Sequence, residues 1–536
     1  MNTMKKILYS VVLVMVLILL SSCEDFLQEK VYTKVTSDYI VSTPSGMASA
    51  VLAMYYKDRE LFRNNNDTET TVWLNMLMGD DITVPRAGEG IPQFGRLLNL
   101  QGSTTTVGRI WRHMYAVIGY ANLVVEASNK VDMTDPVAVQ ALAEAKVFRA
   151  HAYFWLLRKY DRIYLNTRVT TPENVNDSIV YSPADPADVY ELINSDLDYA
   201  IENLSWTTNQ PGRFTQGAAR HIKAKVAACQ QNWQEVANQV NAIDKSGVYS
   251  LVALDNVFNG PDLNHSEAIL VSQWSKGNGG WYISPSTGST SGHRLALHFT
   301  PLYNQEQGML IDFASGGYPW GRLFPNNHLL SKYNKSKDKR YNAYYKHAWT
   351  YNNAAGVPRG KKVGDTIVAA NQAQYLNLHP ACTKYNDSYT RISPQETQSF
   401  KDIIIYRLAE TYLMGAEAYY HLGKSDSLSY YYNKTWERAG NTKFTGAITL
   451  DMIIDEHARE LAMEGDRWFF LKRNGILIDR IKKYGGEYIK TTANVVLMND
   501  TTIRDNVQPH HVRLPIPQAQ IDIMGKENFP QNEGYN

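Results

Sequence analysis

The stretch Leu142–Leu165, LAEAKVFRAHAYFWLLRKYDRIYL, decides the fold of this chain. Five of its residues recur at spacings of three and four, which places them on one helical face: Ala145, Phe148, Ala152, Trp155 and Leu156. Small alanines alternate with large aromatics along this stripe, so a neighbouring helix can approach closely and interlock. Because a helix this apolar on one face needs partners, the stretch predicts a core helix inside a helical array.

Segments of similar size and periodicity flank this stretch and predict four helix pairs. The pairs are 46–63 with 107–129, 142–165 with 186–204, 215–231 with 233–246, and 402–423 with 425–439. In the clearest unit, Phe214–Gly247, small and aromatic residues follow the spacing of tetratricopeptide repeats. Since three or more stacked pairs bury a continuous core, we expect an all-α fold of four tetratricopeptide-like pairs in a right-handed array.

A long irregular insertion, Val248–Phe400, separates the third pair from the fourth. It contains the glycine-rich runs GNGGWY at 277–282 and GGYPWGR at 316–322. Loops of this length inside a compact chain are usually functional, so the insertion is the predicted ligand-binding part. After the fourth pair we expect a helix over Asp451–Arg473 and then an extended, proline-rich tail to residue 536.

The N-terminus is typical of an export signal. Lys5 and Lys6 precede the apolar run Ile7–Leu20, which has the length of a signal-peptide core rather than of a membrane span. Leu20-Ser21-Ser22-Cys23 resembles the lipobox of bacterial lipoproteins, which predicts a signal peptide over 1–22 and a lipid on Cys23. An ordinary secretory signal with a chance cysteine is the alternative. The mature part, 23–536, is expected to be one domain without a second apolar run long enough to span a bilayer.

Charge and cysteine content limit the possible partners. The formal net charge is +1 with no basic stripe, which argues against nucleic acid. Besides Cys23 the chain has Cys229 and Cys382, for which two buried free thiols are favoured over a disulfide.

Catalytic and metal signatures are missing from the sequence. There is no G-x-S-x-G, H-E-x-x-H or P-loop motif, so we expect neither an enzyme nor a cofactor. His510-His511 would point to opposite faces of an extended chain, which disfavours a metal site. The Glu464–Arg467 spacing predicts an ion pair at a helix junction instead of a catalytic pair.

Aromatic residues in the irregular segments carry the binding prediction. They are Trp73, Trp274, Trp281, Trp320 and Trp349. An exposed indole offers a flat face to a sugar ring, although burial beneath the loop is the alternative for each one. The best candidates are Trp281 with Tyr282, and Trp320 with Arg322. From the first half of the chain, Asp81 and Arg86 are expected to add polar contacts.

Four parts of the chain together resemble the SusD/RagB family. They are the lipobox at Cys23, the helix core FRAHAYFWL, the run DEHARELAMEGDRWFFLKR (Asp455–Arg473) and the tail LPIPQAQIDIMGKENFPQNEGY (Leu514–Tyr535). His457 stands where the family usually has arginine, and Phe529-Pro530 departs from the usual tail. The resemblance implies an outer-membrane lipoprotein that captures nutrient glycans or peptides and forms a lid on a SusC-like TonB-dependent transporter.

The acidic Glu24 and Asp25 after Cys23 resemble a surface-export signal, which favours a surface-exposed, lipid-anchored location. The leading hypothesis is a non-catalytic glycan-binding protein, and peptide capture is its closest variant. A surface glycosidase would need two carboxylates roughly 5–10 Å apart in a cleft. A scaffold that binds only protein is disfavoured by the aromatic, glycine-rich insertion.

Overall fold

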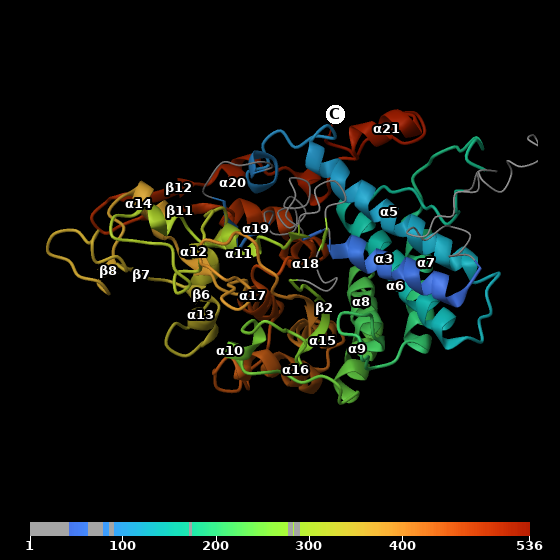
Figure 1. Cartoon of the computed structure of the whole chain (residues 1–536), viewed down its shortest axis with the longest axis horizontal. Helices are drawn as coiled ribbons and strands as arrows, with labels where there is room; N and C mark the ends of the chain where they lie inside the picture. The colour runs from blue at the N-terminus through green and yellow to red at the C-terminus, as the bar shows by residue number, and fades with distance from the viewer. Residues whose placement is uncertain are drawn as a thin grey trace, which may run out of the picture.

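A computed structural model describes residues 42–59, 61–62, 79–84, 91–170, 174–276, 282–283 and 290–535. Helices fill one side of the molecule, on the right in Figure 1, and short strands with long connections fill the other. The predicted signal peptide, Cys23, Arg86, Trp73 and Trp281 lie outside the described residues.

The predicted helical array is present, and most boundaries shift by only a few residues. Its members are α3 (Pro44–Arg59), α5 (Thr105–Ala127), α6 (Pro136–Tyr160), α7 (Pro186–Asn203), α8 (Gln216–Cys229), α9 (Trp233–Lys245), α15 (Leu408–His421) and α16 (Ser425–Arg438). From α5 onward each of these helices packs against the next, and α3 packs across α5 and α6. Consecutive antiparallel neighbours of this kind bury one continuous core, as expected of stacked repeats.

Helix α6 is the centre of the array. It begins six residues earlier than the apolar stripe indicated, because Asp135 caps it by accepting a hydrogen bond from the backbone N–H of Val137 and Pro136 occupies the first position. The expectation of one apolar face is wrong: α3, α5, α7 and α8 surround the helix, and most of its residues are buried. Trp155 departs from the rest of the stripe, since it is only half-buried.

The predicted helix over 402–423 begins as a strand. Ile403–Arg407 forms β10, which pairs antiparallel with β2 (Ala268–Ser272), and the helix α15 starts only at Leu408. Three consecutive isoleucines favour extended backbone because their β-branched side chains pack well on a pleated surface. This pair joins the insertion to the array.

The insertion contains many short elements instead of the irregular chain that we expected. In order they are α10 (Leu254–Val257), β2, β3 (Tyr282–Ile283), β4 (Thr290–Ser291), α11 (Leu295–Phe299), η2 (Tyr303–Gln305), β5 (Phe324–Pro325), α12 (Asn327–Leu330), α13 (Arg340–Ala343), β6 (Tyr345–Lys346), β7 (Trp349–Thr350), β8 (Thr366–Ile367), α14 (Gln372–Leu378) and β9 (Ala381–Cys382). The strands form two-stranded antiparallel pairs. Trp349 and Tyr303 stack in a small separate core, so Trp349 is not a surface residue.

The C-terminal helix predicted over 451–473 is two helices. α17 (Leu450–Leu461) and α18 (Arg467–Arg473) are separated by a turn in which Met463 and Gly465 have φ values of 66° and 97°. The chain continues through α19 (Leu477–Tyr484), β11 (Glu487–Lys490), β12 (Val496–Asp500), α20 (Thr502–Asn506), η3 (Pro509–Val512) and α21 (Gln518–Met524). The predicted extended tail is therefore partly helical.

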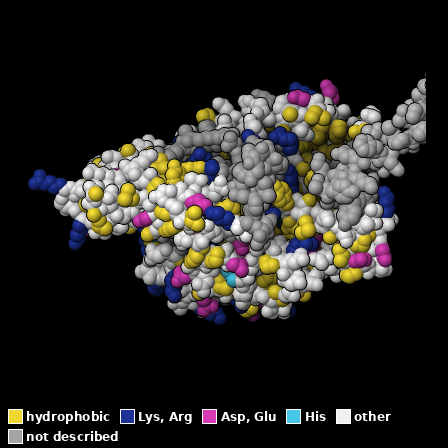
Figure 2. All heavy atoms as spheres, in the orientation of Figure 1, with side chains coloured by type: hydrophobic (Ala, Val, Ile, Leu, Met, Phe, Trp, Pro, Cys, Tyr) yellow, Lys and Arg dark blue, Asp and Glu magenta, His cyan; other side chains and the backbone are white. Residues whose placement is uncertain are grey.

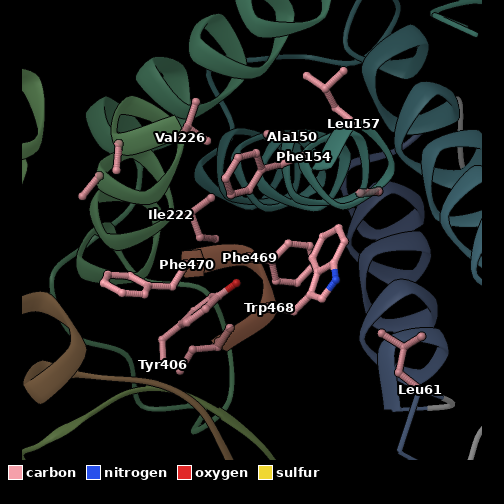
Figure 3. Packing of buried hydrophobic residues seen from close by; sticks show 14 of the residues in the cluster. Leu61, Ala150, Phe154, Leu157, Ile222, Val226, Tyr406, Trp468, Phe469 and Phe470 are labelled. Atoms are coloured by element: carbon pink, nitrogen blue, oxygen red, sulfur yellow. The ribbon is translucent and has the colours of Figure 1, made fainter. Parts of the chain in front are cut away.

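Helix α18 joins the two halves of the molecule. Its Trp468, Phe469 and Phe470 are buried and lie beneath α6 and α8, with Phe154 and Ile222 nearby (Figure 3). The Trp155 ring meets Phe469 edge-on at 5.4 Å. The C-terminal segment is thus part of the core of the N-terminal array.

Two further predictions concern side-chain pairing. Glu464 does not pair with Arg467: its carboxylate binds Arg407 at 2.7 Å and Lys384 at 2.6 Å, while Arg467 binds Asp80 at 2.8 Å. Cys229 and Cys382 are both free thiols, as favoured, but only Cys382 is buried and Cys229 is partly exposed.

His510 and His511 lie on the short 3₁₀ helix η3, where their rings are 4.2 Å apart. The expectation that they point to opposite faces is therefore wrong. Among the described helices, none combines the length and the apolarity that a bilayer crossing requires.

Candidate ligand-binding face

The segment that carries Trp320 is held against helix α11 by backbone hydrogen bonds. The Trp320 N–H donates to the Leu297 carbonyl at 2.8 Å, and the Arg322 N–H donates to the His298 carbonyl at 2.9 Å. Between them Gly321 adopts a φ of 60°, a conformation that side chains disfavour. The glycine therefore allows the turn that fixes Trp320 beside α11.

The Trp320 ring is half-buried and has charged neighbours. The guanidinium of Arg322 lies 4.6 Å and that of Arg294 5.2 Å from the ring centre, both within the range of cation–π attraction. The His298 ring meets the indole edge-on at 5.1 Å. Burial, then the charges of Arg322 and Arg294, hold the pKa of His298 well below its ordinary value, so this imidazole is neutral. The result is an indole flanked by two arginines and one neutral histidine.

A loop from the first half of the chain lies next to this segment. Strand β5 follows Arg322 almost directly and pairs antiparallel with β1 (Ile82–Thr83), with Thr83 opposite Phe324 and Ile82 opposite Pro325. The structure therefore brings the 79–84 loop and the Trp320 segment together, as the proposed shared face requires. The position of Arg86, shortly after β1, stays a prediction.

The hairpin β3–β4 carries Tyr282 toward the same helix. Its backbone pairs Tyr282 with Ser291, and the chain then runs through His293 into α11. The side chain of Tyr282 is outside the described atoms, so its contact with ligand stays a prediction like that of Trp281. Trp274 is buried against the ring of His293, and it is not a surface residue.

Asp80 and Asp81 have opposite electrostatic environments. Burial alone would raise the pKa of Asp80, but the guanidinium groups of Arg467 and Arg480 lower it below its ordinary value, so Asp80 is ionised. Asp81 is only 1% exposed, and neither of its carboxylate oxygens has a hydrogen-bond partner among the described residues. Burial, followed by the charge of Asp80, raises the pKa of Asp81 to about 7. This corrects the expectation that Asp81 lends a surface contact.

The two carboxylates also give no support to a glycosidase. A glycosidase places one protonated and one ionised carboxyl group on either side of a cleft open to the sugar. Asp80 forms ion pairs with Arg467 and Arg480, and the side chains of Asp80 and Asp81 are both buried. Asp80 instead stabilises the fold by holding the Arg467 and Arg480 side chains.

A groove at the end of α3 was missed by the sequence reasoning. It has a volume of about 440 Å³ and lies between α3, β2 and the Arg213–Phe214 segment. The Tyr55 hydroxyl accepts a hydrogen bond from the Phe214 N–H at 2.6 Å, and the Arg213 guanidinium lies 5.3 Å from the Tyr55 ring. In the sequence, Tyr55 on α3 and Phe214 before α8 resemble ordinary core residues. Their neighbours in the chain therefore do not indicate that they lie beside a groove.

The fold is mainly helical, and its candidate site is a face made of one indole and two arginines. A family model described as the SusD family matches residues 281–535, and one described as starch-binding and associating with the outer membrane matches residues 25–227. The chain belongs to the SusD family.

Among curated relatives, the chain is similar to SusD-like protein P25 of Formosa agariphila, with 25% identity over 96% of this chain and 97% of that protein. It is also similar to the starch-binding protein SusD of Bacteroides thetaiotaomicron, with 35% identity over 25% of this chain and 22% of that protein.

Solved structures share the fold. A laminarin-binding SusD-like protein matches with a TM-score of 0.69 and 20% identity, covering 92% of this chain and all of that one. A SusD homolog from Bacteroides thetaiotaomicron matches with a TM-score of 0.72 and 18% identity, covering 93% and 98% of the two chains. At these identities the likeness extends to the fold alone, and the mainly helical, tetratricopeptide-like class is confirmed.

Proposed function

We propose that this protein is a surface-exposed, lipid-anchored outer-membrane protein that binds oligo- and polysaccharides and passes them to a SusC-like TonB-dependent transporter. The observation that carries the binding role is the half-buried Trp320 between Arg294 and Arg322, next to the β1–β5 pair. The match of residues 25–227 to a family model described as starch-binding and associating with the outer membrane supports the same role.

The chemistry of this face suits a sugar. The apolar C–H face of a pyranose ring can lie against the indole of Trp320, while the guanidinium groups donate hydrogen bonds to hydroxyl or carboxylate oxygens. Arg322 thus serves two purposes, because it both orients the indole and faces the ligand. In this proposal Trp281, Tyr282 and Arg86 contribute to the same face, and the role is binding without catalysis.

Calorimetric titration with a polysaccharide panel that includes starch and laminarin tests this proposal. Trp320→Ala should weaken binding by roughly 1–3 kcal/mol, because aromatic anchors dominate such interfaces. The melting temperature should stay nearly unchanged, since the ring is half-exposed. Including mixed tryptic peptides in the panel distinguishes glycan capture from peptide capture.

Trp436→Ala is a matched control for this substitution. Trp436 is also half-buried and also has an arginine over its ring, with Arg459 at 5.2 Å, but it lies on α16. Trp436→Ala should bind like the wild type. If Trp320→Ala also binds like the wild type, or if both variants lose binding equally, the proposed face is misplaced.

The anchor and the transporter partner are tested in cells. The N-terminus has two lysines, an apolar run and a lipobox that ends at Cys23. This pattern predicts that Cys23→Ala leaves the protein unprocessed or released from the membrane. Finding that variant still tightly held in the outer-membrane fraction after a carbonate wash would refute lipidation at Cys23. Affinity purification of the tagged wild type from gently solubilised membranes should recover a TonB-dependent barrel in stoichiometric amount.

A further inference from the structure

A second pocket lies between α5, α21 and the segments 164–170 and 174–181. Helices α5 and α21 lie well away from α11 in Figure 1. Its volume is about 540 Å³, within the range of about 300–1,000 Å³ that is usual for small-ligand sites. Figure 2 shows hydrophobic side chains gathered on the surface between α21 and α5. None of the roles discussed above uses this pocket.

Three tyrosines form one wall of the pocket, and their positions are fixed. The Tyr115 hydroxyl donates to the Tyr164 carbonyl at 2.6 Å and accepts from the Tyr164 N–H at 2.8 Å. The rings of Tyr164 and Tyr181 meet edge-on at 5.0 Å. The Asn166 carbonyl accepts a hydrogen bond from the buried Asn122 amide at 2.8 Å. Because core groups hold this wall, the pocket is formed before any ligand arrives, which lowers the entropic cost of binding.

Helix α21 forms the opposite wall and is tied to the array. The Gln518 N–H donates to the Gly102 carbonyl at 2.9 Å, and Phe529 meets Trp111 edge-on at 6.3 Å. The side of α21 that lines the pocket presents Ile523, which is 69% exposed, and the amide of Gln520. This side combines an apolar surface with a hydrogen-bonding group.

We propose that this pocket is a second carbohydrate site, for a short oligosaccharide. It extends the proposed function to a separate place on the molecule. Tyrosine rings offer flat faces to sugar C–H groups, and the side chains of Asn166, Thr170 and Gln520 offer partners for hydroxyls. An acyl chain would leave these polar groups without hydrogen bonds, which disfavours a lipid.

The charges at the pocket favour a sugar that carries an acidic group. Arg168 pairs with Asp177 at 3.2 Å, whereas the exposed Arg112 has no ion pair within the described part of the chain. A carboxylate or sulfate on the sugar would give Arg112 a charge-assisted hydrogen bond. The ligand class that fits best is therefore an acidic oligosaccharide, with neutral ones binding more weakly.

The test uses the Trp320→Ala protein, so that the first face does not contribute. Saturation-transfer NMR and calorimetry are run with galacturonate oligosaccharides, laminari-oligosaccharides and dodecanoate as probes. Binding of the galacturonate series should persist in Trp320→Ala and fall about tenfold or more when Tyr181→Ala is added. Tyr181→Phe keeps the ring and should retain binding, and Arg112→Gln should weaken the acidic series more than the neutral one.

The outcomes separate this site from the first one. If the wild type binds an oligosaccharide and Trp320→Ala abolishes all binding, the second site is refuted while the proposed function stands. If the oligosaccharides bind neither the wild type nor Trp320→Ala, or if dodecanoate alone binds in a Tyr181-dependent way, the assignment to carbohydrate is overturned as well. If Tyr181-dependent sugar binding is present but Trp320→Ala matches the wild type on the whole panel, the second site stands and the first face falls.

Discussion

Replacing Asp81 by asparagine should stabilise the protein relative to the wild type, and this gain should be larger at alkaline pH than at acid pH. The Asp81 carboxyl is buried, and the part of the chain that the structure describes gives it no hydrogen-bond partner. Burial followed by the charge of Asp80 raises its pKa to about 7. Asparagine has nearly the same shape and carries no charge. Above pH 7 the wild type must therefore keep an unpartnered charge in its interior, and Asp81→Asn does not.

The magnitude follows from the two pKa values of this carboxyl group. In the unfolded chain its pKa is about 3.9, so the raised folded pKa makes a contribution to stability that is complete below about pH 4 and lost as the pH rises through 7. From pH 5 to pH 8 the unfolded carboxyl stays ionised while the folded one loses its proton near pH 7. Two pH units at about 1.4 kcal/mol each give a loss of about 3 kcal/mol. Asp81→Asn should gain this amount over the wild type between pH 5 and pH 8.

The measurement is the free energy of urea unfolding, followed by circular dichroism at pH 5 and pH 8. Asp80→Asn is the adjacent control, because it removes a carboxylate that holds the buried Arg467 and the partly buried Arg480. That variant should lose about 3–5 kcal/mol at both pH values, the usual effect of breaking a buried ion pair. If the stability difference between Asp81→Asn and the wild type is the same at pH 5 and pH 8, the Asp81 carboxyl is not a buried, unpartnered group and the reasoning fails.

Three further predictions concern the core. Phe469→Ala should lower the free energy of unfolding by about 3–5 kcal/mol, and Trp155→Ala by clearly less because its ring is half-exposed; equal losses in chemical denaturation would contradict this burial. Arg340→Ala should cost about 3–5 kcal/mol, because it leaves Glu456 and Glu460 buried without this partner, and a nearly unchanged melting temperature would argue against the network. A thiol reagent should modify Cys382 only after denaturation, since that side chain is buried and burial raises its pKa to about 11; rapid reaction in the native protein would count against its position.

The helices could be predicted from the sequence because their signal is local. Apolar spacing, the caps at Asp135 and Thr215, and proline at the first position of α6 act within a few residues. The strand β10 could not be predicted in this way. Ile403–Ile405 is too short a run to distinguish a strand from the first turn of a helix, and its partner β2 lies far away in the chain.

The exposure of the candidate tryptophans was harder to predict for a similar reason. Trp320 and Trp349 both lie in irregular sequence, yet Trp349 is 1% exposed because it stacks on Tyr303 at 5.1 Å. Trp320 stays half-exposed because backbone bonds to α11 hold its segment at the surface of that helix. The difference in exposure between the two tryptophans depends on contacts with residues far away in the sequence. The residue type and its neighbours in the chain do not specify these contacts.

The charged residues near the C-terminal helices show how the two halves of the chain depend on each other. The run Asp455–Arg473 supported the family resemblance, and its spacing suggested a local Glu464–Arg467 pair. In the structure Arg467 instead binds Asp80, two residues before β1, and Arg480 of α19 binds the same carboxylate. Because β1 pairs with β5, these C-terminal arginines hold the loop that adjoins the Trp320 segment. Through Arg467, this run therefore holds the loop that lies beside the proposed binding face. A substitution at Arg467 should weaken ligand binding only if it also lowers the stability of the fold.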